Sequence, residues 1–141
     1  MSATSSERLR AHLDEDMHEQ LCQVGMETGL ISIEHVLGAP RDGTFAQRLV
    51  NDGTLSPSQL SDLRREAAYR VARGEDKALG ALMVNHGYAA TSLISAALDQ
   101  QRRAFEGERR LVRLSELLVQ AGTLTPGHVV ALRKLRALSF Q

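Results

Sequence analysis

One pattern occurs three times along the chain, and it constrains the fold more than any other feature of the sequence. Each copy has an apolar pair shortly before a glycine and a further aliphatic residue seven positions after that glycine. The copies span residues 44–67, 78–101 and 113–136, and their turn glycines are Gly53, Gly87 and Gly122. Apolar residues spaced three or four positions apart on both sides of a glycine predict two short helices joined by a tight turn. We therefore expect three helix-turn-helix units in tandem.

Polar residues that begin helices support the same division of the chain. Ser56 and Thr125 each precede a proline, which places a capping side chain before a residue suited to the first helical turn. In the central copy, Thr91 is the candidate N-cap. A partial fourth copy covers residues 20–37 around Gly29, and the glycine and proline that follow it cut its second helix short.

The remaining segments complete the predicted organisation. Apolar residues recur every three or four positions from residue 7 to about residue 29, which predicts a longer N-terminal helix. Residues 38–43 are expected to form a loop, and residues 73–76 are expected to break the helix between the first and central copies. The sequence thus predicts an all-α fold of about six to eight helices, mostly shorter than about 16 residues.

The predicted helices require tertiary packing, because such short helices are not stable alone in water. We predict that the helix-turn-helix repeats pack into a compact helical domain behind the N-terminal helix. The predicted segments are residues 1–42, with the N-terminal helix and the partial repeat, and residues 43–141, with the three tandem units.

The amino-acid composition constrains the core, the partners and the compartment that we expect for this protein. The chain has no tryptophan and few other aromatic residues, so its core must consist of Leu, Val, Ala and Met. Seventeen basic and seventeen acidic residues cancel, which gives no overall field to attract nucleic acid or an anionic membrane. Cys22 is the single cysteine, which is typical of a reducing compartment. With neither a signal peptide nor a membrane span in its pattern, the protein is expected in the cytoplasm.

The central copy resembles the N-terminal domain of type II secretion and type IV pilus assembly ATPases, the MshEN family. The consensus of that family runs RLGxxLVxxGLIxxxxLxxxLxxQ. The central copy follows it without gaps at Leu79-Gly80, Met83-Val84, Gly87, Ile94, Leu98 and Gln101. In the family, two tandem copies bind cyclic di-GMP. The resemblance therefore implies a bacterial, non-catalytic regulatory module built from helical repeats, with cyclic di-GMP as its ligand and no resident cofactor.

The resemblance also implies a ligand site. Guanidinium groups would bind guanines or phosphates, small residues would let the backbone approach the ligand, and apolar side chains would lie under the bases. The residues carried over to these roles are Leu79, Gly80, Leu98, Gln101, Arg113 and Leu114. The arginine that opens the family motif is retained at Arg113, but it is Ala78 in the central copy and Thr44 in the first. The alternative interpretation is that the leucines form core, the glycine permits close helix packing and the arginines are solvated.

Two functions remain open on these residues. The module binds cyclic di-GMP, or it is a protein–protein adaptor that docks on a secretion, pilus or motility component without nucleotide. The second function predicts an exposed apolar patch, with the N-terminal helix as the candidate location. The lost opening arginines favour docking, whereas the intact central copy favours nucleotide binding. A homodimer is a further expectation.

Histidine, cysteine and carboxylate side chains are common metal ligands, so their spacing bears on whether the chain has a metal site. On the N-terminal helix His18 and Cys22 stand one turn apart, as do His12 and Asp16, but the two pairs do not converge on one site. We therefore predict no metal. The histidines at positions 35, 86 and 128 follow or flank the turns and are expected to be surface or capping groups.

Catalysis and DNA binding find little support. The sequence has no glycine-rich phosphate loop, no GxSxG elbow and no HExxH motif, so we expect no catalytic residues and no enzyme. A DNA-binding helix-turn-helix is disfavoured, because the second helices carry serine and aspartate with little basic charge. Only the last helix has a basic cluster, at Arg133, Lys134 and Arg136.

Overall fold

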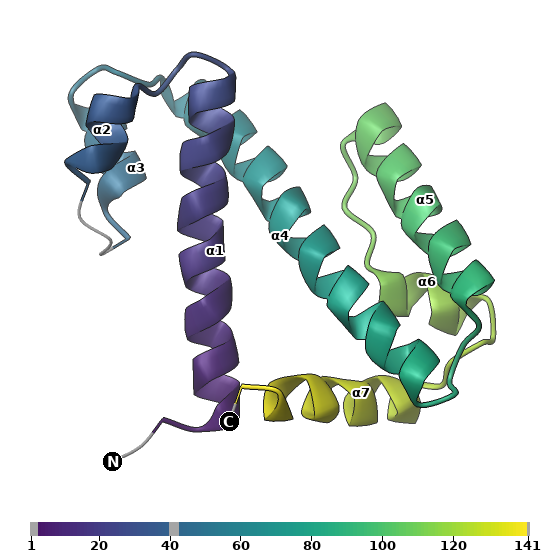
Figure 1. Ribbon diagram of the computed structural model, residues 1–141. Coiled ribbons are helices and arrows are strands. Elements are labelled where there is room, and N and C mark those ends of the chain that lie inside the picture. Colours follow the sequence, from purple (N-terminus) through teal and green to yellow (C-terminus); the bar gives the residue numbers. More distant parts are fainter. Residues whose placement is uncertain (1–2, 40–42, 141) are drawn as a thin grey trace. The chain divides into compact units, whose positions relative to one another are not determined.

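The computed structural model describes residues 3–39 and 43–140, and within them the chain is all α-helical (Figure 1). The helices are α1 (Ser5–Glu27), α2 (Ile33–Leu37), α3 (Phe45–Asn51), α4 (Pro57–Asn85), α5 (Thr91–Glu108), α6 (Leu114–Gln120) and α7 (Pro126–Leu138). No strand occurs in the described ranges. The predicted all-α class and the longer N-terminal helix are confirmed. The expectation of mostly short helices holds for only four of these seven, because α1, α4 and α5 have 23, 29 and 18 residues.

The first helix begins and ends close to the predicted residues. At its start the Glu7 backbone N–H donates to Thr4 Oγ1, and the Thr4 backbone N–H donates to Glu7 Oε2, both at 3.1 Å. This reciprocal pair satisfies donors that have no partner within the helix. The helix ends at Glu27, two residues before the glycine of the first turn.

One backbone turn follows each of α1, α3, α4 and α6. The glycine at its centre lies in the left-handed region, with φ values of +76°, +82°, +76° and +78° at Gly29, Gly53, Gly87 and Gly122. In the second turn the Leu55 N–H donates to the Leu49 carbonyl at 3.0 Å, which closes the helix end. Glycine adopts this backbone conformation without the steric cost that a Cβ brings. The fourth copy predicted around Gly29 therefore has a complete turn.

The residue three positions after each turn glycine is the N-cap of the next helix. Ser32, Ser56 and Thr125 accept hydrogen bonds from backbone N–H groups in the first turn of α2, α4 and α7. His35 and His128 complete two of these caps, since their Nδ1 atoms accept from the backbone N–H groups of Ser32 and Thr125. The predicted capping role of these two histidines is confirmed.

The predicted N-cap of the central copy is wrong. Ala90 occupies the cap position, with φ −77° and ψ 151°, and it has no side-chain cap hydrogen bond. Thr91 is instead the first residue of α5. Thr91 has the side chain of an N-cap residue, but the turn at Gly87 places the cap conformation three residues after the glycine, at Ala90.

The predicted break at residues 73–76 is also wrong. Helix α4 runs without interruption from Pro57 to Asn85, so it is both the second helix of one repeat and the first helix of the next. Gly74 lies inside this helix with open space where a Cβ would be. A glycine in a helix interior costs only about 0.5–1 kcal/mol relative to alanine, and packing of the helix easily outweighs that amount.

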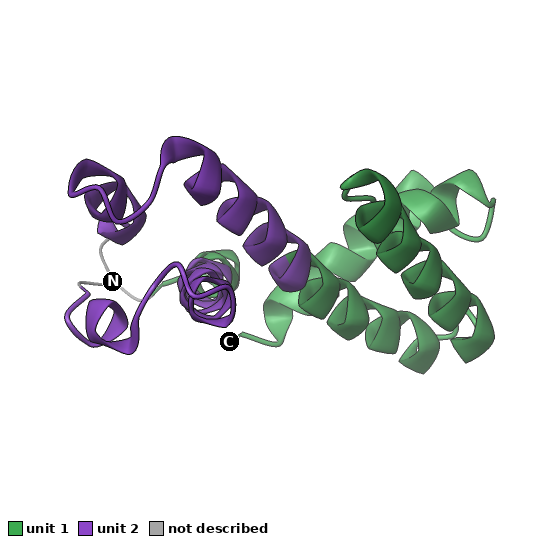
Figure 2. Ribbon diagram, turned by 90° about the horizontal axis from the view of Figure 1, so that it is seen from above, with its two compact units in different colours: residues 1–10, 72–141 green, residues 11–71 purple. Residues whose placement is uncertain are grey.

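The chain divides into two compact units, coloured separately in Figure 2. Unit 2 comprises residues 11–71 and contains the turns at Gly29 and Gly53, whereas unit 1 comprises residues 1–10 and 72–141 and contains the other two turns. The units therefore group the repeats in pairs. This division does not coincide with the predicted boundary between residues 42 and 43.

Each unit has its own hydrophobic core. In unit 2 the buried side chains come from α1, α3, α4 and the turns, and they include Leu21, Phe45 and Leu60. In unit 1 they come from α4, α5, α6 and α7, and they include Met83 and Leu132, both fully buried. Of the loop predicted at residues 38–43, residues 40–42 lie outside the described ranges. Among the described helices, none has both the length and the apolar character to span a membrane.

Candidate functional site

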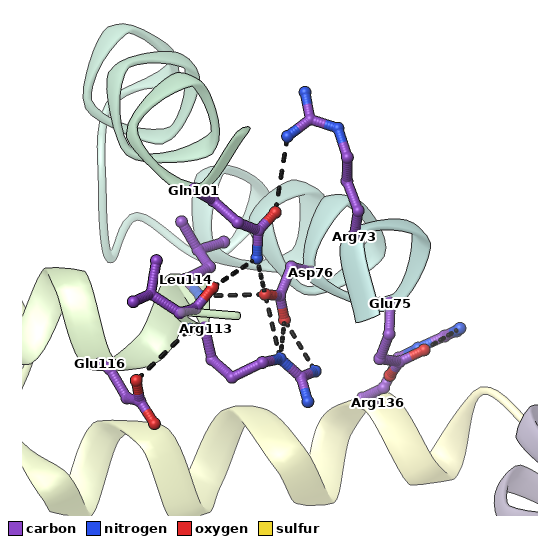
Figure 3. Close-up of polar contacts among 9 residues, drawn as sticks. Arg73, Glu75, Asp76, Gln101, Arg113, Leu114, Glu116 and Arg136 are labelled. Atoms are coloured by element: carbon purple, nitrogen blue, oxygen red, sulfur yellow. Dashed lines mark hydrogen bonds and ion pairs between the residues drawn. The ribbon is translucent and has the colours of Figure 1, made fainter. Parts of the chain in front are cut away.

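The candidate site of unit 1 is centred on the carboxylate of Asp76, which is 1% exposed on α4 (Figure 3). Arg113 donates to its Oδ1 from Nη2 at 2.9 Å and from Nε at 3.2 Å. Gln101 Nε2 donates to Oδ2 at 2.7 Å, and the Leu114 backbone N–H donates to the same oxygen at 2.9 Å. Three segments of the chain therefore meet at one buried charge.

Gln101 is fully buried on α5, and both ends of its amide are bonded. Besides Asp76, its Nε2 donates to the Val112 carbonyl at 2.8 Å. Its Oε1 accepts from Arg73 Nη1 at 3.5 Å, and the same nitrogen donates to the Leu98 carbonyl at 2.8 Å. In the described residues no buried side-chain nitrogen or oxygen is left without a hydrogen bond. The cluster, which we call the Asp76 cluster (Arg73, Asp76, Gln101, Arg113), is thus internally satisfied.

Helical spacing explains why Asp76 faces the core. Ala72, Leu79 and Met83 lie on the same face of α4, since they stand four residues before and three and seven residues after it. All three are buried. An ionised carboxylate in such a place requires charged or hydrogen-bonding partners, because burial without them is costly.

Arg113 supplies the compensating charge from the N-cap position of α6. Its extended backbone, with φ −93° and ψ 148°, precedes a helix whose first N–H groups have no helical acceptor. Burial lowers the pKa of Arg113, but the hydrogen bond and the charge of Asp76 raise it more, so the net shift is upward. Arg113 therefore stays cationic at every pH relevant to the protein.

The structure brings three of the six predicted ligand residues together. Gln101, Arg113 and Leu114 all contact Asp76, although the Leu114 contact is through its backbone N–H. The Leu114 side chain is fully buried, whereas the Arg113 side chain is 41% exposed. The predicted polar residues therefore converge on a protein carboxylate.

The other three predicted residues lie in the hydrophobic core of unit 1. Leu79 is buried, and Leu98 is half-buried against that core. Gly80 lies where helices approach closely, since a Cβ there would be 2.7 Å from Cγ2 of Ile94. These positions match the alternative interpretation of the sequence, in which the leucines form core and the glycine permits close packing.

Sequence reasoning missed Asp76 and Arg73, because both fall in the segment that was expected to break the helix. A signal was present in the sequence: Asp76 continues the spacing of the apolar face that leads to Leu79 and Met83. An acidic residue on an otherwise apolar helix face indicates a buried polar contact. Its partners could not be inferred, since they lie 25 to 38 residues further along the chain.

A second ion pair links α4 to α7. Arg136 donates to both oxygens of Glu75, from Nε at 2.8 Å and from Nη2 at 2.9 Å. The two side chains are only 18% and 13% exposed. Of the basic cluster that was weighed for DNA binding, Arg136 is therefore engaged within the protein, and Arg133 and Lys134 are exposed.

The contacts of the Asp76 cluster are those of a structural site that joins α4, α5 and the start of α6. The carboxylate accepts from four donor nitrogens of three residues, so its lone pairs are occupied by the protein itself. The described ranges also contain no group of three or more His, Cys, Asp or Glu residues placed to hold a metal ion.

Comparisons with protein-family models, with curated proteins and with solved structures found no match to this chain. The MshEN resemblance therefore stays a prediction from the residues.

Proposed function

We propose that this chain is a non-catalytic regulatory module of the secretion and pilus ATPase N-terminal type, and that it acts by docking on a protein component of a secretion, pilus or motility machine. One observation supports this proposal most: the polar side chains expected to bind a nucleotide bind groups of the protein itself. Gln101 is fully buried, and Arg113 is paired with Asp76. Binding cyclic di-GMP through these groups would require breaking contacts that hold three helices together.

Exposed apolar residues support the docking mode. Helix α2 carries Ile33 and Leu37 four residues apart, on one face, and they are 52% and 79% exposed. Large apolar side chains gathered on a short surface helix are typical of protein interaction sites. We therefore assign the docking surface to this face of α2.

A direct titration tests the proposal that the chain docks without binding a nucleotide. Isothermal titration with cyclic di-GMP, with GTP and cyclic di-AMP as controls, is expected to give no binding heat and no thermal shift. Micromolar binding of cyclic di-GMP would overturn docking without nucleotide.

Docking itself is tested with candidate components of secretion, pilus or motility machines in biolayer interferometry. Leu37→Ser should weaken a positive interaction by about tenfold or more, because a large exposed apolar contact is lost. Leu111→Ser is the matched control, since Leu111 is also exposed but belongs to the other unit. Equal losses in both variants would contradict the assignment of the surface to α2.

Cyclic di-GMP binding is the second candidate, and the 41% exposure of the Arg113 side chain favours it. Arg113→Ala is a poor test, because it leaves the buried Asp76 carboxylate without its charged partner. Arg113→Lys keeps a positive charge near Asp76 but removes the planar, bidentate donor that recognises a guanine. If the wild type binds cyclic di-GMP, loss of binding in Arg113→Lys at an unchanged melting temperature would support this candidate.

A further inference from the structure

A cavity of about 640 Å³ lies in unit 2, between α1, α3 and α4. Apolar side chains line it, among them Met17 and Phe45. Asp14 on α1 and Arg64 on α4 also line it, and both are exposed. The cavity thus combines an apolar wall with charged groups at its edge.

The repeat explains where this cavity comes from. His18, which lines it, stands eleven residues before Gly29, as Asp76 stands eleven residues before Gly87. The turn glycines therefore identify the cavity as the place in unit 2 that corresponds to the Asp76 cluster of unit 1.

The two places differ because one helix is short. In unit 1, α5 continues to Glu108 and brings Gln101 onto Asp76. In unit 2 the corresponding helix, α2, ends at Leu37, and the residue that corresponds to Gln101 is Gly43. The cavity is therefore a surface of the kind that a helix covers in the other unit.

Helix α7 carries a face with exposed apolar and basic side chains. Val130, Lys134 and Leu138 stand four residues apart on one side of it, and Arg133 lies beside them. Val130 and Leu138 are 52% and 50% exposed, and both basic residues are exposed. This side of α7, which we call the α7 outer face, is apolar and basic.

Charge is divided between the units although it cancels over the whole chain. Residues 11–71 contain ten acidic and five basic residues, whereas residues 1–10 and 72–141 contain seven acidic and twelve basic residues. Unit 2 is therefore acidic and unit 1 basic. Opposite net charges on two surfaces favour an encounter between them.

We propose that two copies of this chain associate, with the α7 outer face of one copy in the unit 2 cavity of the other. Val130 and Leu138 contact the apolar wall, and Lys134 faces Asp14. The acidic residue Asp14 belongs to α1, whereas the basic residue Arg64 belongs to α4. The basic residues of the bound α7 therefore face α1. This inference is independent of the proposed function, since self-association requires neither a nucleotide nor a machine component.

Sedimentation equilibrium tests the association with the full chain. At 0.1 M salt the average mass should rise above the 15.4 kDa of the monomer as concentration increases. At 1 M salt it should fall back, because the Debye length shrinks from about 10 Å to about 3 Å. A wild-type chain that remains monomeric at all concentrations in low salt would overturn the proposal.

Charge reversal identifies the surfaces. Asp14→Lys and Lys134→Glu should each weaken association by about tenfold or more. The matched controls are Asp62→Lys and Lys77→Glu, which reverse exposed charges in the same units at residues that neither line the cavity nor belong to α7. Val130→Asp should also weaken association at high salt, where charge is screened, whereas Val84→Asp should not.

A mixing experiment decides the geometry. The Asp14→Lys chain keeps an intact α7 outer face, and the Lys134→Glu chain keeps an intact cavity. The two should therefore form a 1:1 complex at concentrations at which each variant alone has lost most of its association. Circular dichroism should show the same helix content in all variants, because every substituted side chain is exposed. Absence of a complex in the mixture, or equal losses in the control variants, would refute this arrangement.

Discussion

Asp76→Asn tests the claim that a buried charge holds unit 1 together. Asparagine has nearly the size of aspartate but replaces one acceptor oxygen by an NH2 group. In the wild type both oxygens accept hydrogen bonds, Oδ1 from Arg113 and Oδ2 from Arg113, Gln101 and Leu114. Whichever way the asparagine amide is oriented, its NH2 group faces a donor.

The size of the effect follows from the contacts that are lost. A hydrogen bond to a charged group contributes about 1.5–3 kcal/mol, and removing one partner of a buried ion pair costs about 3–5 kcal/mol. Arg113 is 41% exposed and recovers part of its hydration, which limits the loss on its side. We therefore expect Asp76→Asn to lower the free energy of unfolding by about 3–4 kcal/mol, the lower part of that range.

Urea unfolding followed by circular dichroism measures this change. With a slope of about 2 kcal/mol per molar urea, the midpoint should fall by roughly 2 M. Asp99→Asn is the matched control in the same unit, because Asp99 pairs with Arg102 and Arg103 on the surface of α5 and such exposed pairs contribute little to stability.

A double-mutant cycle separates the ion pair from the other contacts of Asp76. Arg113→Met alone leaves the carboxylate buried without its charged partner, so the two single losses should add to more than the loss in the double variant. A loss below about 1 kcal/mol in Asp76→Asn would refute the reasoning that this carboxylate anchors three helices.

Three further predictions concern helix packing, capping and pH. Gly80→Ala should lower the free energy of unfolding by about 1–3 kcal/mol because its Cβ would overlap a neighbouring side chain, whereas Gly74→Ala in the same helix should raise it by about 0.5–1 kcal/mol; urea midpoints that move in the same direction would contradict this. Ala90→Ser should raise the free energy of unfolding by about 1 kcal/mol, since it supplies the missing cap of α5, and an unchanged melting temperature would argue against that geometry. The hydrogen bond from Arg70 lowers the pKa of Glu27 from 4.5, so its stabilisation exists above about pH 4.5 and disappears as the pH falls through the lowered pKa; Arg70→Gln should therefore lower the melting temperature at pH 7 but not in strong acid.

The parts of the fold that depend on neighbouring residues could be predicted from the sequence. The glycine turns and the caps at Ser56 and Thr125 involve contacts within a few residues, so the local sequence specifies them. The same rule identifies the cap of α5: the caps of α2, α4 and α7 each stand three residues after a turn glycine, and this spacing points to Ala90 rather than Thr91.

The parts that depend on distant residues could not be predicted. Gly74 and its charged neighbours suggest a helix break when they are considered alone, but α4 is continuous because its buried face packs in both units. The candidate site has the same limitation. The residues carried over from the family consensus include Gln101 and Arg113, yet only the fold shows that Asp76 lies between them.

The four repeats share one backbone turn but have different surfaces around it. The turn and the buried residue eight positions before each glycine are shared, as Leu21, Phe45, Leu79 and Leu114 demonstrate. The repeats differ in the length of the helix after the turn. That length determines whether the chain itself covers the surface beside the turn and its buried residue. Where α5 is long, the space holds a satisfied polar cluster, and where α2 is short, it is an open cavity. We therefore expect this chain to bind a partner where the repeat is incomplete, because in the complete copy the chain's own helix fills the corresponding space.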